Sequence, residues 1–333
     1  MLPGIWSRRG PLALLLWPLS LLYGWIVRVR RGCYRAGLFR VVRVSAPVVV
    51  VGNVIVGGSG KTPVLMELAR HLSDHGHRVG VLSRGYGRRG RDCLEVSADG
   101  SASDFGDEPL LIKRTLGVPV FVANDRGQAA VSLLSKYPAT TVILCDDGLQ
   151  HLGLARDIEI CLFHDQGLGN GFLLPAGPLR EPWPRSVDLV LSAARPPAPG
   201  HFRVERQLAS RAIRSDGSSV TLDALRGKRL VALAAIAHPE NFFSMLRAQG
   251  LELEQTIALA DHDNFDDFQW PADDARELVF TEKDATKIWS KDAGGWAIPL
   301  LVSLDPGFIL SFDRLLEARL SLRTETLPDA KDG

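Results

Sequence analysis

The amino-acid sequence predicts an α/β fold: a doubly wound parallel sheet with a second, smaller α/β lobe and an N-terminal membrane-associated helix. Three observations predict it. Short β-branched runs alternate with helical stretches along most of the chain, a glycine-rich loop follows the first of these runs, and an uncharged apolar segment lies near the N-terminus. Alternation of strands and helices is typical of a parallel sheet covered by helices.

Composition and charge exclude several classes of protein. The chain has 333 residues, of which 46% are hydrophobic and 23% charged, so disordered and collagen-like proteins are excluded. The four cysteines lie far apart with no C-x-x-C pair, which argues against a zinc site or a disulfide framework and favours a reducing compartment. The first acidic residue is Glu67, so residues 1–66 carry a charge of +9 and the rest −8. No nucleic-acid partner is expected.

The N-terminal segment, residues 1–43, is predicted to associate with a membrane. Pro11–Val27 contains no charge, includes three aromatic residues and has arginines on both sides. As a helix it would reach about 26 Å, slightly less than the roughly 30 Å of bilayer hydrocarbon, and Pro18 weakens a straight span. No signal-peptide cleavage site follows it. We therefore expect a retained helix that either spans the membrane or lies on it, the alternative being a buried, wholly apolar core helix.

Residues 44–200 are predicted to form the first domain. Its expected strands are nearly continuous apolar runs, as in a sheet covered on both faces. Helices are expected at Thr62–His75 and Asp125–Tyr137. The strands fall at 47–52, 77–83, 118–123, 140–145, 158–163 and 187–192.

A linker ribbon at 201–222 is predicted to lead into a smaller C-terminal α/β lobe at 223–333. The linker lacks the strand–helix rhythm and is rich in polar residues. Beyond it we expect a helix at 239–250 and strands at 229–236, 251–257, 277–281 and 298–303.

The glycine-rich loop predicts a P-loop NTPase-like site for a nucleoside triphosphate. Backbone N–H groups of such a loop surround phosphate oxygens, Lys61 can reach the β- and γ-phosphates, and the Thr62 hydroxyl can ligate Mg²⁺. Ile55 stands where the strict pattern has glycine. The ATP-binding residues expected are Ile55, Val56, Gly57, Gly58, Ser59, Gly60, Lys61 and Thr62.

Carboxylates follow the predicted strand at 140–145 and also precede an earlier helical stretch, at Asp107. Asp146 and Asp147 follow the strand at 140–145, where a parallel sheet opens to its ligand, so one of them is expected to hold Mg²⁺. A surface turn is the alternative for this Asp-Asp-Gly. Asp107, His151, Glu181 and His262 could each be structural by themselves, Asp107 as a helix cap.

Seven motifs in order make the chain resemble the tetraacyldisaccharide 4'-kinase family of lipid A biosynthesis. They are VGNVIVGGSGKTP (51–63), SRGYGR (83–88), GDEP (106–109), DDGLQH (146–151), LLPAGPLREP (173–182), ADHDNF (260–265) and TEKDATK (281–287). The resemblance implies transfer of the ATP γ-phosphate to the 4'-hydroxyl of an acylated disaccharide 1-phosphate, with Mg²⁺, at the cytoplasmic face of the bacterial inner membrane. No obligate protein partner is implied.

The resemblance also implies roles for individual residues. Asp107 would take the hydroxyl proton with His262 as its partner, and Lys61 would act at the phosphates. Thr62, Asp146, Asp147 and Glu181 would surround Mg²⁺, whereas Arg84, Tyr86 and His151 would face the lipid headgroup.

Two features depart from the family pattern, and two other classes of protein share some of the motifs. Ile55 replaces an expected threonine, and AAIAHPENFF (234–243) lacks the usual glycines.

A cytosolic kinase or ligase of the dethiobiotin synthetase type would share the loop without needing residues 11–27. A membrane-bound nucleotide switch or metal-delivery protein would bind a protein partner and leave lipids unmodified.

Overall fold

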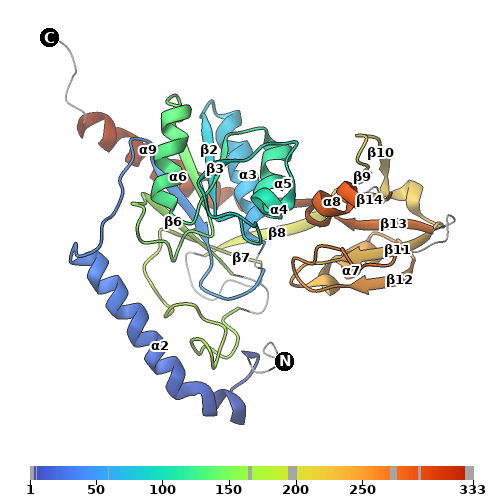
Figure 1. Cartoon of the computed structure of the whole chain (residues 1–333), viewed down its shortest axis with the longest axis horizontal. Coiled ribbons are helices and arrows are strands. Elements are labelled where there is room, and N and C mark those ends of the chain that lie inside the picture. The colour runs from blue at the N-terminus through green and yellow to red at the C-terminus, as the bar shows by residue number, and fades with distance from the viewer. Residues whose placement is uncertain are drawn as a thin grey trace. The chain divides into compact units, whose positions relative to one another are not determined.

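The computed structural model describes residues 4, 6–58, 60–163, 167–193, 201–270, 276–291 and 294–326. For residues 324–326 it describes the backbone alone. The chain forms two compact units (Figure 1). The first consists of Met1–Ser83, Asp125–Glu205 and Leu304–Gly333, and the second of Arg84–Asn124 and Arg206–Ser303. Both units therefore combine segments that are distant in sequence, whereas the predicted domains were each continuous.

The N-terminal helix α2 extends over Pro11–Arg35 and continues through Pro18. Its length and composition are sufficient to cross a membrane. The fully buried positions of α2 are the small residues Ala13, Ser20 and Gly24. A side chain at Gly24 would place its Cβ 2.6 Å from Leu173 Cδ1, so glycine permits the close approach. The large apolar side chains of α2 remain exposed.

The first unit contains a parallel sheet with the strand order β8-β7-β6-β1-β5-β2. The strands are β1 (Val48–Gly52), β2 (Val79–Ser83), β5 (Val142–Asp146), β6 (Ile158–Phe163), β7 (Leu189–Ser192) and β8 (Phe202–Leu208), the last of which leads into the second unit. β1, β2 and β5 are buried along their whole length, as their apolar runs predict. The predicted α/β fold with a parallel sheet is confirmed.

Helices α3 (Lys61–Asp74) and α6 (Arg126–Lys136) pack on this sheet. α3 contacts β1 and β5 through buried residues such as Leu65 and Leu68. The Asp125 carboxylate accepts hydrogen bonds from the Gly127 and Gln128 N–H groups, and this contact satisfies two donors at the start of α6. Both helices lie within about one residue of their predicted bounds.

A long C-terminal helix, α9 (Pro306–Thr326), belongs to the first unit and was not predicted. Phe308 and Phe312 are fully buried, and the Phe308 ring lies 5.8 Å from that of Phe202 in β8. Arg323 donates to the Asp157 carboxylate at 2.8 and 2.9 Å. These contacts join the C-terminal segment to the first unit, whereas the sequence predicts it within the smaller lobe at 223–333.

The second unit contains a sheet with the order β10-β9-β14-β13-β11-β12. Its strands are β9 (Arg211–Ile213), β10 (Ser219–Thr221), β11 (Arg229–Ala234), β12 (Leu253–Ala258), β13 (Arg276–Thr281) and β14 (Trp296–Ile298). β11 pairs in parallel with β12 and β13, and β13 pairs in parallel with β14. β9 pairs antiparallel with β10 and β14. The predicted linker ribbon thus contains paired strands.

The remaining elements of the second unit include helix α5, which begins at the predicted site residue Asp107. The helices are α4 (Ala102–Phe105), α5 (Asp107–Leu116), α7 (Pro239–Ala248), α8 (Glu282–Ile288), η1 (Leu222–Leu225) and η2 (Trp289–Lys291). A short antiparallel pair joins β3 (Leu94–Glu95) and β4 (Val120–Val122), and β15 (Leu300–Leu304) precedes α9. α5 packs against α8.

Truncation of Phe312 tests whether α9 is part of the folded core. We expect Phe312→Ala to lower the free energy of unfolding by about 3–5 kcal/mol, because it removes a fully buried ring. The matched control is Leu310→Ala on the same helix, where the side chain is 53% exposed, with an expected change within about 0.5 kcal/mol. Urea unfolding measures both changes, and equal losses would contradict the placement of α9.

Candidate functional site

The loop between β1 and α3 has the backbone conformation expected of a phosphate-binding turn. Gly57 and Gly60 adopt φ angles of 113° and 70°, which glycine reaches without strain. Gly60 is the residue immediately before α3, so the helix N-terminus opens directly into the loop. The side chain of Asn53 is buried beneath the loop, and its Nδ2 lies 3.5 Å from the Gly57 carbonyl oxygen. Ser59, predicted to bind ATP, lies outside the described residues.

The departure at Ile55 has a structural explanation. Ile55 forms an antiparallel bridge with Leu179, and the Val56 N–H donates to the Pro178 carbonyl at 2.9 Å. The Arg180 N–H donates in turn to the Val54 carbonyl at 2.7 Å. This part of the loop is therefore strand-like, and a β-branched residue suits it better than glycine. The phosphate-facing turn begins at Gly57.

Lys61 and Arg180 surround the carboxylate of Asp147. Lys61 Nζ lies 3.5 Å from Asp147 Oδ1, and Arg180 Nη1 donates to both carboxylate oxygens at 2.9 and 3.1 Å. Burial would raise the pKa of Asp147, but the two cations outweigh it and hold the pKa below its usual value. Asp147 has a φ of 48°, in the left-handed region that aspartate adopts more readily than most residues. Arg180 was not among the predicted site residues.

Asp146 and Thr62 have the donor chemistry that Mg²⁺ prefers. Asp146 ends β5 in register with Val51 of β1, so its carboxylate lies beside the strand that leads into the loop. It is 2% exposed and lies 3.5 Å from the Ser83 hydroxyl. Thr62 is buried in the first turn of α3. A threonine hydroxyl and a buried aspartate are oxygen donors of the type that hold Mg²⁺ in P-loop proteins.

Glu181, the third predicted carboxylate at the metal, is occupied by other partners. Arg31 of α2 lies 2.6 Å from its Oε2, Arg185 lies 3.4 Å away and Gln150 Nε2 donates at 2.7 Å. In the described part of the chain no three His, Cys, Asp or Glu side chains gather as a metal-binding group. The side chains that fit Mg²⁺ best are therefore Thr62 and Asp146, with Asp147 and Glu181 bound by cations.

Gln150 and His151, which follow β5 in the chain, make further hydrogen bonds near Glu181 and the loop in the first unit. The Gln150 side chain also donates to the Asn53 carbonyl at 3.0 Å, so it connects Glu181 to the base of the phosphate loop. His151 follows in a turn whose N–H donates to the Gly148 carbonyl at 2.9 Å. The DDGLQH motif therefore contributes Asp147 and Gln150 to one hydrogen-bonded network.

In the second unit, Asp107 and His262 are hydrogen-bonded as predicted from the two motifs. His262 Nδ1 lies 3.0 and 3.1 Å from the two Asp107 oxygens. Asp107 is the first residue of α5 and follows Gly106, whose φ is 91°. A Cβ at Gly106 would lie 2.9 Å from the Tyr86 carbonyl oxygen, so the glycine permits the turn that presents Asp107. His262 itself has a φ of 66°.

Two lysines of α8 complete the Asp107 environment and were missed as site residues. Lys287 Nζ lies 3.0 Å and Lys283 Nζ 3.9 Å from Asp107 Oδ2, and Lys283 also lies 3.3 Å from His262 Nε2. Burial opposes ionisation of Asp107, but the His262 hydrogen bond and the two lysines outweigh it and hold its pKa well below the usual range. The i, i+4 spacing of the lysines in TEKDATK places them on one helix face but does not indicate that this face meets Asp107.

Arg84 and Tyr86, predicted to face the lipid headgroup, also lie in the second unit. The Tyr86 ring lies 4.9 Å from the His262 ring, and the side chain is 61% exposed. Arg84 is exposed at the first position of the unit. Tyr86 is thus brought to the Asp107–His262 pair.

Asp284 supports the backbone that holds His262. The His262 N–H donates to the Ala235 carbonyl at 3.2 Å, and the Ala235 N–H donates to Asp284 Oδ2, also at 3.2 Å. The Thr281 hydroxyl donates to the same oxygen at 2.6 Å. Burial raises the pKa of Asp284 to about 6.

The sheet, loop and helix of the first unit define a protein of the P-loop NTPase class. The sequence profile of the tetraacyldisaccharide-1-P 4'-kinase family, LpxK, matches residues 12–319. The chain belongs to the tetraacyldisaccharide 4'-kinase family.

Relatives and a solved structure agree over nearly the whole chain. The tetraacyldisaccharide 4'-kinase of Acidovorax sp. (strain JS42) is 54% identical over 96% of this chain and 94% of its own length. That of Azoarcus sp. (strain BH72) is 42% identical over 95% of this chain and 94% of its own length. The crystal structure of LpxK from Aquifex aeolicus, an "apo" form in complex with ATP, gives a TM-score of 0.80 at 31% identity, covering 93% of this chain and 99% of that one.

The raised pKa of Asp284 predicts a pH-dependent stability. The folded chain binds this proton more tightly than the unfolded chain, so the contribution of Asp284 to stability falls as the pH rises from about 4 to about 6. The expected loss is on the order of 2–3 kcal/mol. Asp284→Asn, which can still accept both hydrogen bonds, should remove this part of the pH dependence in urea unfolding.

The exposed Asp267, also in the second unit, provides the matched control for Asp284. Asp267→Asn should keep the wild-type pH dependence of unfolding. The same pH dependence in wild type and in Asp284→Asn would contradict the assignment to Asp284.

Proposed function

We infer that this protein is a tetraacyldisaccharide 4'-kinase, which transfers the γ-phosphate of ATP to the 4'-hydroxyl of tetraacyldisaccharide 1-phosphate in lipid A biosynthesis. Family membership over residues 12–319 is the observation that carries this conclusion. The phosphate-binding loop and the Asp107–His262 pair supply the chemistry that such a transfer needs.

ATP is proposed to bind at the loop between β1 and α3. The relative from Aquifex aeolicus was solved with ATP, which supports this choice of nucleotide. The positive φ angles of Gly57 and Gly60 allow backbone N–H groups to approach phosphate oxygens. Lys61 would move from Asp147 to the β- and γ-phosphates, and Arg180 would continue to neutralise the aspartate. Positive charge at the transferring phosphoryl group stabilises the transition state.

Mg²⁺ is proposed to bind through the Thr62 hydroxyl and the Asp146 carboxylate. When bound, the ion neutralises phosphate charge and aligns the phosphates for transfer. Asp147 lies on the adjacent position of the chain but is held by Lys61 and Arg180. Glu181 is proposed to act from further away, by holding Gln150 and Arg31 in place.

Asp107 and His262 are proposed to accept the proton of the 4'-hydroxyl as a hydrogen-bonded pair. The carboxylate fixes the imidazole through Nδ1, and the two lysines keep Asp107 ionised. A carboxylate with so low a pKa is a weak base, so we propose that the lysines shift away from it when the substrate binds. Tyr86, Arg84 and His151 are proposed to contact the headgroup of the lipid acceptor.

The N-terminal helix is proposed to hold the enzyme at the cytoplasmic face of the bacterial inner membrane. Leu15, Leu22 and Trp25 are 74%, 56% and 60% exposed, which is unusual for side chains of this kind in water. Arginines at the C-terminal end of α2 suit an anionic membrane surface. A substrate with four acyl chains remains in the bilayer, so a kinase that acts on it must reach the headgroup level.

Replacement of Lys61 tests the nucleotide site. We expect Lys61→Ala to lower transfer of labelled phosphate from Mg-ATP to tetraacyldisaccharide 1-phosphate by at least about 10³-fold, because charge stabilisation of the phosphoryl group is lost. The exposed Lys136 on α6 provides the matched control, and Lys136→Ala should keep wild-type turnover. ATP hydrolysis by wild type without labelled lipid would contradict the proposed function and favour a nucleotide switch.

Replacement of Asp107 tests the proton-accepting pair. Asp107→Ala should lower kcat by about 10²–10⁴-fold and leave ATP affinity unchanged, since Asp107 acts on the acceptor hydroxyl. Steady-state kinetics and binding of an ATP analogue measure the two effects. Asp99→Ala, an exposed carboxylate of the same unit, is the control. An unchanged kcat in Asp107→Ala would exclude Asp107 from proton transfer.

A further inference from the structure

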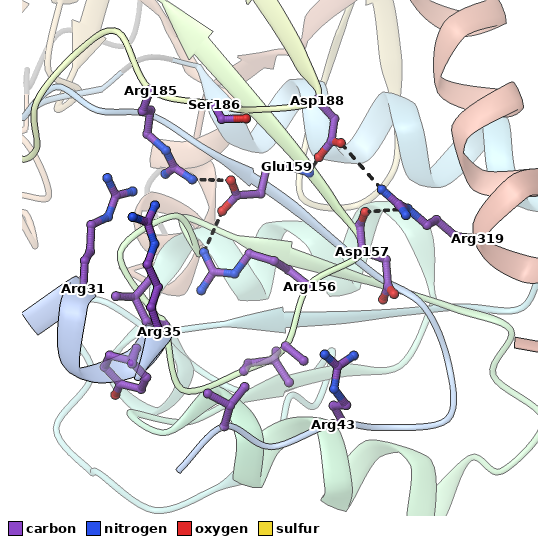
Figure 2. Close-up of a pocket in the computed structure, with 15 residues that line it drawn as sticks. Arg31, Arg35, Arg43, Arg156, Asp157, Glu159, Arg185, Ser186, Asp188 and Arg319 are labelled. Atoms are coloured by element: carbon purple, nitrogen blue, oxygen red, sulfur yellow. Dashed lines mark hydrogen bonds and ion pairs between the residues drawn. The ribbon is translucent and has the colours of Figure 1, made fainter. Parts of the chain in front are cut away.

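An arginine-lined pocket lies in the first unit, apart from the phosphate-binding loop. It encloses about 520 Å³ between the C-terminal end of α2, the segment that follows α2, the residues flanking β6 and β7, and α9. Figure 2 shows the side chains that line it. Six of them are arginines: Arg31, Arg35, Arg43, Arg156, Arg185 and Arg319.

The acidic side chains of the pocket do not balance these arginines. Three carboxylates line it, and each is already paired. Glu159 is held by Arg156 and Arg185. Asp157 pairs with Arg323 of α9 at 2.8 Å, and Asp188 accepts the Glu159 N–H at 2.8 Å. The carboxylates are therefore committed to arginines or backbone, and the pocket retains a net positive charge.

Arg35 and Arg43 carry the unbalanced charge. Neither makes a hydrogen bond or an ion pair in the part of the chain that the structure describes, whereas Arg31 pairs with Glu181 at 2.6 Å. Arg31 and Arg35 extend from the same helix, and Arg43 comes from the segment after it (Figure 2). Two guanidinium groups without anions in one pocket present the planar donor geometry that binds phosphate oxygens.

The position of the pocket on α2 indicates the source of the phosphate. Val29 is the last of the exposed large apolar side chains on α2. Measured from Val29 along the helix axis, Arg31 lies about 3 Å away and Arg35 about 9 Å away. The polar layer of a bilayer is about 5–8 Å thick on each side. If α2 enters the bilayer along its axis, Arg31 lies within this polar layer and Arg35 at its outer edge, so the pocket lies close to the level of the lipid phosphates.

We propose that this pocket binds the phosphate of an anionic membrane phospholipid and so fixes the protein on the bilayer surface. The inference rests on the proposed membrane association of α2. Arg35 and Arg43 bind the phosphate oxygens, and the paired arginines around them hold the pocket open. The ligand is a lipid of the surrounding membrane and is distinct from the kinase substrate.

Vesicle flotation of the full chain tests the proposal. The probes are phosphatidylcholine vesicles with and without phosphatidylglycerol. The pocket variant is a double substitution, Arg35→Gln together with Arg43→Gln. The matched control combines Arg28→Gln and Arg40→Gln, which remove the same amount of charge as the pocket variant. Both of these arginines are exposed and lie outside the pocket. The pocket variant should weaken the binding that depends on phosphatidylglycerol about tenfold more than the control does. Equal weakening would show diffuse attraction and overturn the proposal.

A lysine variant separates site geometry from charge. Arg35→Lys with Arg43→Lys keeps the charge and removes the planar fork, so we expect a loss of several-fold in binding to phosphatidylglycerol vesicles. Full retention would overturn the proposal. Thermal unfolding of each variant checks that the chain is folded, and the lysine variant provides the test if the glutamine variant is not.

Three further outcomes identify the source of the ligand and show which part of the proposal fails. Millimolar glycerol 3-phosphate should compete only weakly with vesicles, and competition strong enough to release the protein would assign the pocket to a free phosphate ester and overturn the lipid assignment. Wild type that floats equally well with neutral and anionic vesicles refutes the pocket alone. Wild type that floats with neither refutes membrane association, whereas kinase activity in detergent tests the proposed function independently.

Discussion

The backbone of residues 172–181 supports both the N-terminal helix α2 and the loop between β1 and α3. On one side the Ser20 hydroxyl of α2 donates to the Leu173 carbonyl at 2.7 Å and accepts the Ala176 N–H at 3.0 Å. On the other side this segment pairs with residues 54–56 of the loop. Buried backbone groups are costly to leave without partners, so neither α2 nor the loop can shift without breaking hydrogen bonds of this segment. The LLPAGPLREP motif therefore has a structural role.

Both candidate centres hold a carboxylate between two cations. Asp147 lies between Lys61 and Arg180 in the first unit, and Asp107 lies near two lysines of α8 in the second. A buried carboxylate is costly unless it is paired, so the cations stabilise each centre in the absence of substrate. In the proposed reaction they are also the charges available to the phosphates of the two substrates. The same side chains can therefore stabilise the fold before binding and the reaction after it.

The sequence predicted the elements whose signals are local. Apolar runs located the strands of the parallel sheet, and glycines followed by Lys61 and Thr62 located the loop. It also paired Asp107 with His262 through the family resemblance, and the hydrogen bonds at 3.0 and 3.1 Å agree with that pairing. Contacts between distant segments were harder to predict. The helix α9 joins the first unit through rings buried against β8, and no local pattern indicates which unit a C-terminal helix will join.

The missed site residues have the same cause. Arg180 is adjacent to the predicted Glu181, but only the fold brings its guanidinium to Asp147. Lys283 and Lys287 had the right spacing for one helix face, yet nothing local shows that α8 packs on α5. At Ile55 the comparison with a motif suggested a defect, whereas the bridge to Leu179 explains the residue. Single residues were thus predictable where the backbone positions them, and unpredictable where a partner from another element does.

The ion pair between Arg31 and Glu181 has a practical consequence for protein production. Arg31 belongs to the apolar helix that a soluble version of the protein would lack, whereas Glu181 is 2% exposed and contacts Gln150 beneath the phosphate loop. Deleting α2 would leave a buried carboxylate with one cation fewer, and it would also remove the Ser20 hydrogen bonds to residues 173–176. A shortened chain is therefore an altered catalyst, and kinetic constants measured on it would not describe the full-length enzyme.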